Sequence, residues 1–294
     1  MLNTNSYRIL FSFFAIWITS NFSFKYQQLI GFVVIFLFGI LHGANDLALF
    51  QKINENKVYL SIKKMIIYYI LIVSIGALLF FYIPIFALLL FILFSSYHFG
   101  EQHWNELEIV NQNQILVLFQ TVYGLFILSL LFSFHEIEVK NIIQQISNTS
   151  IAELNFKIII SIVGLILLIL GIVMYRISKK FKSEIVLNLF YLLVFAIIFK
   201  TADLIWAFAI YFVVWHSIPS MKEQIHFLYG DCTVTNFKRY FKSAFLYWIA
   251  SLIGIGILYM LFKEYKIFNA LFFSFLAAIT FPHTLIIIKM QNRA

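Results

Sequence analysis

The chain has 294 residues, of which 62% are hydrophobic and only 12% are charged, and its formal net charge is +8. Soluble domains are about 25% charged, so this composition excludes an ordinary soluble protein and predicts an integral membrane protein. The single cysteine excludes an internal disulfide framework and a cysteine-rich zinc or iron–sulfur site, so a bound metal would need histidine or carboxylate ligands.

Ten apolar segments are long enough, or nearly so, to span a membrane as helices of about 20 residues. In chain order they cover residues 8–20, 27–49, 65–82, 85–104, 114–134, 157–175, 184–199, 203–218, 243–262 and 268–288. The longest polar connections, 51–64, 135–156 and 219–242, are too short for a soluble domain. The sequence therefore predicts an all-α integral membrane protein, a polytopic bundle of about ten transmembrane helices that forms a single domain over residues 1–294.

The distribution of Lys and Arg predicts the orientation of this bundle. With the N-terminus inside, 15 of the 21 basic residues fall in cytoplasmic segments and six on the other side, although the 105–113 loop contributes none. Both termini are then cytoplasmic, and the expected location is the inner (plasma) membrane. Because basic loops between spans explain the positive charge, the lipid bilayer is the expected partner and nucleic acid is not.

Five of the seven histidines lie within or at the ends of apolar segments: His42, His98, His103, His216 and His283. The predicted topology places them toward the cytoplasmic ends of four helices that run from outside to inside. Ionisable side chains at membrane depth cost free energy and mark functional sites. Neutral imidazole binds Zn, Cu, Fe or Ni, so the pattern predicts a shared metal site without choosing the metal.

The run HGAND places Asp46 one helical turn after His42, where its carboxylate can orient the imidazole. Two alternatives remain open for Asp46, which are a helix cap and an ion pair with Lys52 at the membrane edge. Gly43 would allow a neighbouring helix or a substrate to approach closely.

The run YHFGEQHW places Glu101 on the same helical face as His98, whereas His103 lies about 140° around the helix. One ion cannot easily bind both histidines, so His98 is the expected ligand. Glu101 is expected to support the ligands, and His103 and Trp104 to lie at the membrane interface.

Two of the three prolines lie within three residues of a buried histidine. Pro219 frees the carbonyl of Trp215 beside His216, and Pro282 does the same beside His283, so each is expected to loosen its helix. A proline at an ordinary helix end is the alternative. Four further residues are expected to be structural or exposed: Asp203 as a helix cap, His135 and His226 on the surface, and Cys232 as an inert loop thiol.

The runs LHGANDL (41–47), YHFGEQHW (97–104) and WHSIPS (215–220) resemble the Brp/Blh family of bacterial β-carotene 15,15′-dioxygenases. The resemblance covers most of the chain. It implies that residues 1–294 form a transmembrane catalytic domain that cleaves β-carotene with O₂ into two molecules of all-trans-retinal at an Fe(2+) centre. Retinal is then expected to pass to a rhodopsin.

The resemblance also implies that His42, His98 and His216 are iron ligands. Members of that family commonly have another histidine one helical turn after the third, but Ser220 occupies that position here. Either the site has three histidine ligands and open positions, or another helix supplies a fourth ligand, for which His283 is the candidate. Asp46, Glu101 and Ser220 are expected to lie beside the ligands and to support them.

Two other functions fit a membrane protein rich in buried histidine. A di-iron desaturase or hydroxylase typically carries HxxxH and HxxHH runs, and the sequence contains neither. A transporter with a histidine proton relay would usually show inverted repeats, and none is visible in the sequence. The carotenoid-cleaving dioxygenase is the favoured hypothesis.

Overall fold

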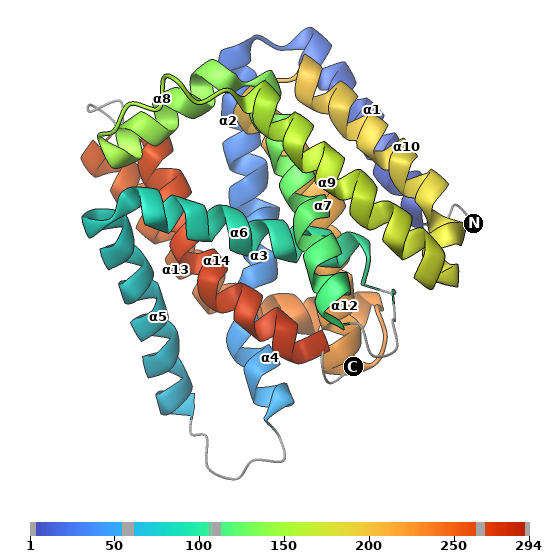
Figure 1. Cartoon of the computed structure of the whole chain (residues 1–294). Coiled ribbons are helices and arrows are strands. Elements are labelled where there is room, and N and C mark those ends of the chain that lie inside the picture. Colours follow the sequence, from blue (N-terminus) through green and yellow to red (C-terminus); the bar gives the residue numbers. More distant parts are fainter. Residues whose placement is uncertain (1–3, 55–61, 106, 108–112, 263–267, 292–294) are drawn as a thin grey trace. The chain divides into compact units, whose positions relative to one another are not determined.

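The computed structural model describes residues 4–54, 62–105, 107, 113–262 and 268–291, which are followed along the chain in Figure 1. Regular secondary structure in these residues is entirely helical. Eight of the described helices are long and apolar enough to cross a membrane, and a ninth apolar stretch, Ile66–Tyr82, is shorter. The predicted all-α, polytopic membrane fold is confirmed.

The helices occupy all ten predicted segments. They are α1 (Thr4–Asn21), α2 (Phe24–Val34), α3 (Ile40–Gly43), α4 (Asp46–Ile53), α5 (Ile62–Tyr82), α6 (Pro84–His103), α7 (Asn113–Phe134), α8 (Glu136–Ser147), α9 (Phe156–Ile177), α10 (Lys179–Thr201), α11 (Leu204–Ile210), α12 (Ile218–Tyr229), α13 (Val234–Phe262) and α14 (Phe268–Gln291), with π-helical turns η1 (Ile35–Gly39) and η2 (Tyr211–Ser217).

Two helices, α8 and α12, lie in stretches that the sequence presents as polar connections. In α8 the acidic residues Glu136 and Glu138 stand in the first turn, where they interact favourably with the helix dipole. Lys140 pairs with Glu136 at 2.7 Å across one helical turn. Local charge placement therefore stabilises a short helix that has no long apolar run.

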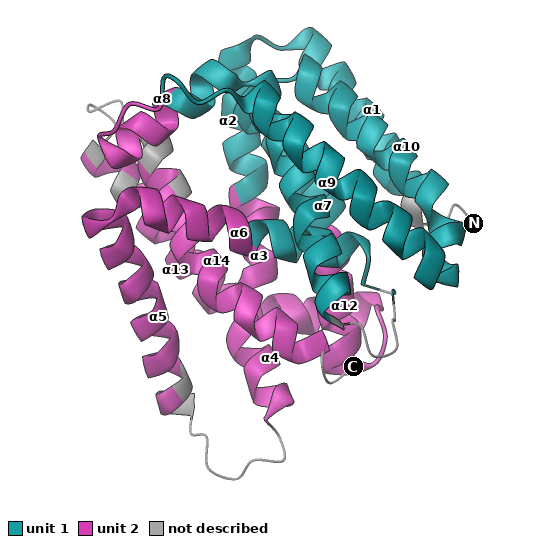
Figure 2. Cartoon of the chain, viewed as in Figure 1, with its two compact units in different colours: residues 1–35, 95–140, 152–216 teal, residues 36–94, 141–151, 217–294 magenta. Residues whose placement is uncertain are grey.

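The chain divides into two compact units, coloured teal and magenta in Figure 2. Unit 1 comprises residues 1–35, 95–140 and 152–216, and unit 2 comprises residues 36–94, 141–151 and 217–294. Both units draw on distant parts of the sequence. The prediction that residues 1–294 form one catalytic domain stays a prediction.

In unit 1, α7 packs against α9 and α10, and α11 packs against α2. A Cβ atom at Gly100 would lie 1.7 Å from the carbonyl oxygen of Gln120, and one at Gly124 would lie 1.9 Å from that of Ser96. Only glycine fits at these two positions, so α6 and α7 cross with their backbones in direct contact.

Two polar side chains of α1 accept hydrogen bonds from other helices of unit 1. Ser12 accepts a hydrogen bond from Nε1 of Trp215 at 2.8 Å, and Thr19 accepts one from Nε1 of Trp206 at 3.0 Å. These acceptors are two helical turns apart and so share a face of α1. Buried indole donors thus find partners inside the unit.

The N-terminus of α11 confirms the predicted cap at Asp203. Its carboxylate accepts hydrogen bonds from the backbone N–H of Ile205 at 3.0 Å and from the amide of Gln28 at 3.2 Å.

In unit 2, α14 packs against α4 and α5, and α13 packs against α3, α12 and α14. Leu49 and Ile53 of α4 bury against Ile286, Ile287 and Met290 of α14. The i, i+4 spacing of the α4 residues gives that short helix one apolar face. This contact fixes α14 beside the helix break that follows His42.

Candidate metal centre

The helix that contains His42 breaks directly after it. The π-helical turn η1 leads into the short helix α3, which ends at Gly43, and α4 begins at Asp46. Between them, Asn45 donates from its amide to the carbonyl of Tyr240 at 2.9 Å and accepts from the hydroxyl of Ser243 at 2.6 Å. The break is therefore anchored to α13 of the same unit.

The imidazole of His42 is buried and has a defined tautomer. Its Nδ1 is hydrogen-bonded to the carbonyl of Gly39, so Nδ1–H donates and Nε2 carries the lone pair that can bind a metal. The hydroxyl of Tyr240 lies 2.7 Å from Oε1 of Gln224 and 3.2 Å from the carbonyl oxygen of His42. A phenol carries one proton, so Tyr240 donates to Gln224 at the shorter distance, and the carbonyl of His42 is a weaker second acceptor.

His283 is oriented by a buried carboxylate. Its Nδ1 lies 2.6 Å from Oδ1 of Asp46, and the hydroxyl of Tyr69 donates to Oδ2 of Asp46 at 3.2 Å. His283 and Asp46 are both nearly inaccessible to solvent. This is the carboxylate–histidine arrangement that orients metal ligands and leaves Nε2 to bind the ion.

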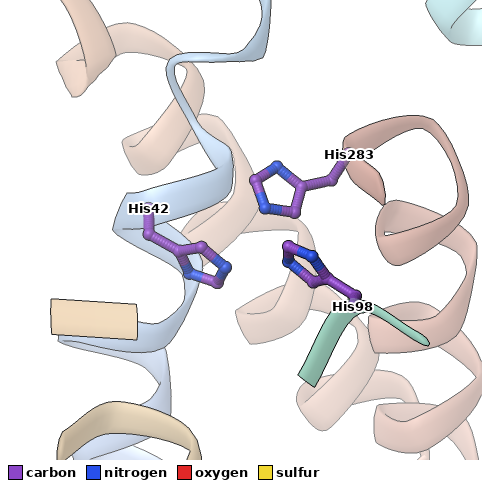
Figure 3. Close-up of side chains that lie close together, drawn as sticks. All are labelled: His42, His98 and His283. Atoms are coloured by element: carbon purple, nitrogen blue, oxygen red, sulfur yellow. The ribbon is translucent and has the colours of Figure 1, made fainter. Parts of the chain in front are cut away.

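The two histidines of unit 2 face each other, as Figure 3 shows. The ring centroids of His42 and His283 are 4.7 Å apart and the rings are perpendicular. A potential ligand nitrogen of each ring lies within 4.8 Å of that of the other. The third labelled side chain, His98, belongs to unit 1.

Asp46, expected to orient His42, binds other partners: its carboxylate binds His283 and Tyr69, and Nδ1 of His42 binds the carbonyl of Gly39. That expectation assumed one continuous helix, in which residues four apart share a face. Because the chain leaves the helix between Gly43 and Asp46, this relation is lost and the carboxylate points to α14 instead. A Cβ atom at Gly43 would lie 3.8 Å from Nδ1 of His283, so the structure has room for alanine there.

Unit 1 holds a second histidine pair. His98 of α6 and His216 of η2 are both buried, and their ring centroids are 4.5 Å apart at an interplanar angle of 82°. The ring of Phe99 lies 4.8 Å from that of His216, and the ring of Phe212 stacks on it at 5.6 Å. Aromatic side chains thus surround this pair.

The loosening predicted beside His216 is present. The helix winds as the π-helical turn η2 over Tyr211–Ser217, and Pro219 stands at the start of α12 directly after it. Single π-helical turns occur often at functional sites, because they shift the side chains that follow. In α14, Pro282 lies inside a continuous helix immediately before His283, so the loosening expected there stays a prediction.

His103 and Trp104, expected at the membrane interface, pack against other side chains of unit 1. Trp104 is 1% exposed, and the ring of His103 is parallel to that of Tyr211 at a centroid distance of 6.0 Å. The hydroxyl of Tyr211 lies 3.4 Å from Nε2 of His103. Both residues pack inside unit 1 because the last turn of α6 is held against α7 by the Gly100 crossing.

The remaining predicted residues fall as follows. Glu101 is buried in unit 1, and Ser220 is buried in unit 2, where its hydroxyl accepts from Nε2 of Gln224 at 3.1 Å. His226 and Cys232 are exposed as expected, but the surface position predicted for His135 is wrong: its ring is buried and pairs with Glu138 at 3.2 Å.

The sequence does not predict a role at the metal centre for Tyr69, Tyr240 or Gln224. Each is a hydrogen-bonding residue around the histidines of unit 2. The two tyrosines are among 16 in the chain, and neither stands in a run that marks it. Only the helix packing brings them to Asp46 and His42.

An apolar cavity of about 510 Å³ lies in unit 2 beside this cluster. Helices α3, α4, α5, α13 and α14 form its wall, which includes Gly43, Asp46 and Tyr69 and is otherwise largely apolar, as at Val73 and Phe275. Its volume is in the range of small-molecule binding sites. The cavity can hold an apolar molecule against the residues that orient His283.

Comparison with known proteins identifies the family. The family model described as Beta-carotene 15,15'-dioxygenase matches residues 33–291. No curated protein matches the chain, and no solved structure does. The chain therefore belongs to the beta-carotene 15,15'-dioxygenase family, as the three sequence runs predicted, and is a membrane dioxygenase of a family whose substrate is β-carotene.

Proposed function

We propose that this family member cleaves β-carotene at the central 15,15′ double bond with O₂ and releases two molecules of all-trans-retinal. The proposed cofactor is one Fe(2+) ion, ligated by His42, His98, His216 and His283. The observation that carries the proposal is a buried histidine pair in each unit of a chain that belongs to this family. Residues 1–294 then act as a single catalytic domain.

The donor set fits iron. Imidazole nitrogens suit Fe(II), and an apolar site favours the neutral, ligating form of the ring. Metal–nitrogen bonds are roughly 2.1 Å long, so two ligands of one ion lie at most about 4.2 Å apart. The nitrogens of His42 and His283 lie within 4.8 Å of each other, and small ring rotations would bring them to that spacing.

The positive charge of the ion must also be compensated in an apolar site. Four neutral imidazoles would leave the two positive charges of Fe(2+) uncompensated, which is costly away from water. Asp46 accepts from His283 and contributes a negative charge directly beside a ligand. Glu101 is a second buried carboxylate, in unit 1.

Iron(II) held by these histidines would supply the activation of O₂ for cleavage of the alkene. Cleavage replaces one carbon–carbon double bond by two carbonyl groups and takes up no proton, so Asp46 and Tyr69 need only hold His283. We assign the apolar cavity of unit 2 to one half of the polyene, because its wall reaches Asp46 and Gly43. Its apolar lining also excludes water from reactive species.

The proposed setting is the inner (plasma) membrane, with both termini in the cytoplasm. β-Carotene would enter from the lipid, and a retinal-binding rhodopsin would consume the product. Protease protection of tags at the two termini in sealed vesicles tests this orientation.

The primary test is expression of the chain in bacterial cells that accumulate β-carotene, with chromatography of retinal and analysis of iron in the purified protein. We expect pigment loss, retinal formation and about one iron per chain. Folded, iron-loaded protein that leaves β-carotene intact would refute the proposal. His42→Ala, His98→Ala and His216→Ala should each abolish cleavage without removing the protein from the membrane.

His283 has a test of its own, because the sequence resemblance does not place it. His283→Ala should lower iron content together with cleavage. Full activity and full iron content in this variant would remove His283 from the ligand set.

The cavity assignment is tested by filling it. A Cβ atom at Gly254, in the cavity wall, meets no atom within 4 Å, and the same holds for Gly256, two residues further along α13 but outside that wall. Gly254→Leu should therefore slow cleavage of β-carotene at unchanged iron content, whereas Gly256→Leu should not. Equal activity of the two variants would contradict the assignment.

A further inference from the structure

A second apolar cavity lies in unit 1 and takes no part in the proposed reaction. It has a volume of about 450 Å³, and its wall is formed mainly by α7, α9 and α10. Phe126, Leu167 and Leu192 give it an almost wholly hydrocarbon lining. Gly171 also lines it, and a Cβ atom there would meet nothing within 4 Å.

One end of this cavity is positively charged. Arg176 lines it, and Nζ of Lys182 lies over the ring of Tyr175, another lining residue, at 5.2 Å. Neither Arg176 nor Lys182 has a carboxylate partner within the described parts of the chain. By contrast, the neighbouring Lys180 is paired with Glu184 at 3.1 Å.

We propose that this cavity binds an anionic phospholipid, with an acyl chain along the apolar wall and the headgroup phosphate at Arg176 and Lys182. The positive charge of Arg176 and Lys182 decides the class of ligand. A neutral apolar molecule would leave both cations without an anionic partner, whereas an anionic headgroup would pair with them. The predicted positive-inside topology would place this end at the cytoplasmic surface, where such headgroups lie. The site does not depend on the proposed catalytic chemistry.

Trp104 lines the cavity and supplies a local probe. The full chain is reconstituted in phosphatidylcholine vesicles that contain a small fraction of brominated phosphatidylglycerol or, separately, of brominated phosphatidylcholine. Bromine quenches tryptophan fluorescence only at short range, so a brominated acyl chain in the cavity, whose wall includes Trp104, should quench it more strongly than lipid outside the cavity does. The Trp104→Phe variant measures the contribution of the other four tryptophans.

We expect brominated phosphatidylglycerol, and not brominated phosphatidylcholine, to quench the Trp104 component. Arg176→Gln and Lys182→Gln should each weaken this binding roughly fivefold. Lys180→Gln changes the net charge equally but removes a paired cation, and should leave the binding unchanged. Gly171→Leu should abolish it by filling the cavity.

Equal quenching by the two lipids, or no quenching of Trp104 by either, would overturn the proposal. Mass spectrometry of the detergent-purified protein gives a second readout that does not need Trp104. Wild type should retain phosphatidylglycerol, and Gly171→Leu should not. Retention of the lipid by Gly171→Leu would likewise overturn the proposed location.

Discussion

The two units each bury a histidine pair, but the surroundings of the pairs differ in kind. In unit 1 the rings of Phe99 and Phe212 pack against His216. In unit 2 a backbone carbonyl and the Asp46 carboxylate bind Nδ1 of His42 and His283. Aromatic packing fixes where a ring lies, whereas a hydrogen bond also fixes which nitrogen is left for a metal. We expect substitutions that change side-chain packing to have the larger effect in unit 1, and substitutions that remove hydrogen bonds to have the larger effect in unit 2.

The largest effect is expected at the helix crossing of unit 1. Gly100→Ala places a Cβ atom 1.7 Å from the backbone oxygen of Gln120, so the helix backbones must separate. The cost should exceed the usual 1–3 kcal/mol of overpacking and lower the thermal unfolding midpoint in detergent by about 5 °C or more. Gly43→Ala in unit 2, where the structure has room, is the matched comparison and should change the midpoint little.

The second-largest effect, a loss of iron affinity, is expected when the carboxylate that orients His283 is removed. Asp46→Ala leaves Nδ1 of His283 without its acceptor, and loss of such a partner typically lowers metal affinity about 10- to 100-fold. Iron titration of the purified protein measures this affinity. In unit 1, Phe212→Leu removes a stacked ring from His216 without removing a hydrogen-bond acceptor, and should alter the affinity less. The opposite ranking would contradict the contrast between the units.

A smaller loss of iron affinity is expected at Tyr69, which donates its hydrogen bond to Asp46 and not to the proposed ligand His283. Tyr69→Phe removes the hydroxyl that donates to Asp46 and leaves the ring in place. A hydrogen bond to a charged group contributes about 1.5–3 kcal/mol at most, and because Tyr69 acts through Asp46 we expect only a few-fold loss of iron affinity. Retinal formation at saturating iron should recover toward the wild-type rate, which separates a positioning role from a structural defect.

The smallest change in iron content and stability is expected at Tyr211, the tyrosine that lies beside His103 in unit 1. The hydroxyl of Tyr211 lies 3.4 Å from His103, which is long for a hydrogen bond, while the parallel rings remain in contact without it. Tyr211→Phe should therefore change iron content and the unfolding midpoint by less than the Tyr69→Phe substitution. A larger effect would mean that unit 1 also depends on polar contacts.

The sequence by itself determined the membrane class, the ten helical segments, the family and the positions of the buried histidines. These are local properties: apolar length specifies a spanning helix, and a few short runs specify the family. Pro219 also acts within its own helix, so its effect on the turn beside His216 was predictable.

Only the tertiary structure decided which residues surround the histidines. Asp46 binds His283 because the chain breaks after Gly43 and because α14 packs against α4. Tyr69 and Tyr240 reach the cluster from α5 and α13 through the same packing, and the cavity of unit 2 is lined by helices distant in sequence. Spacing along one helix predicts which side chains share a face, but the partner across that face depends on how helices cross and where they break.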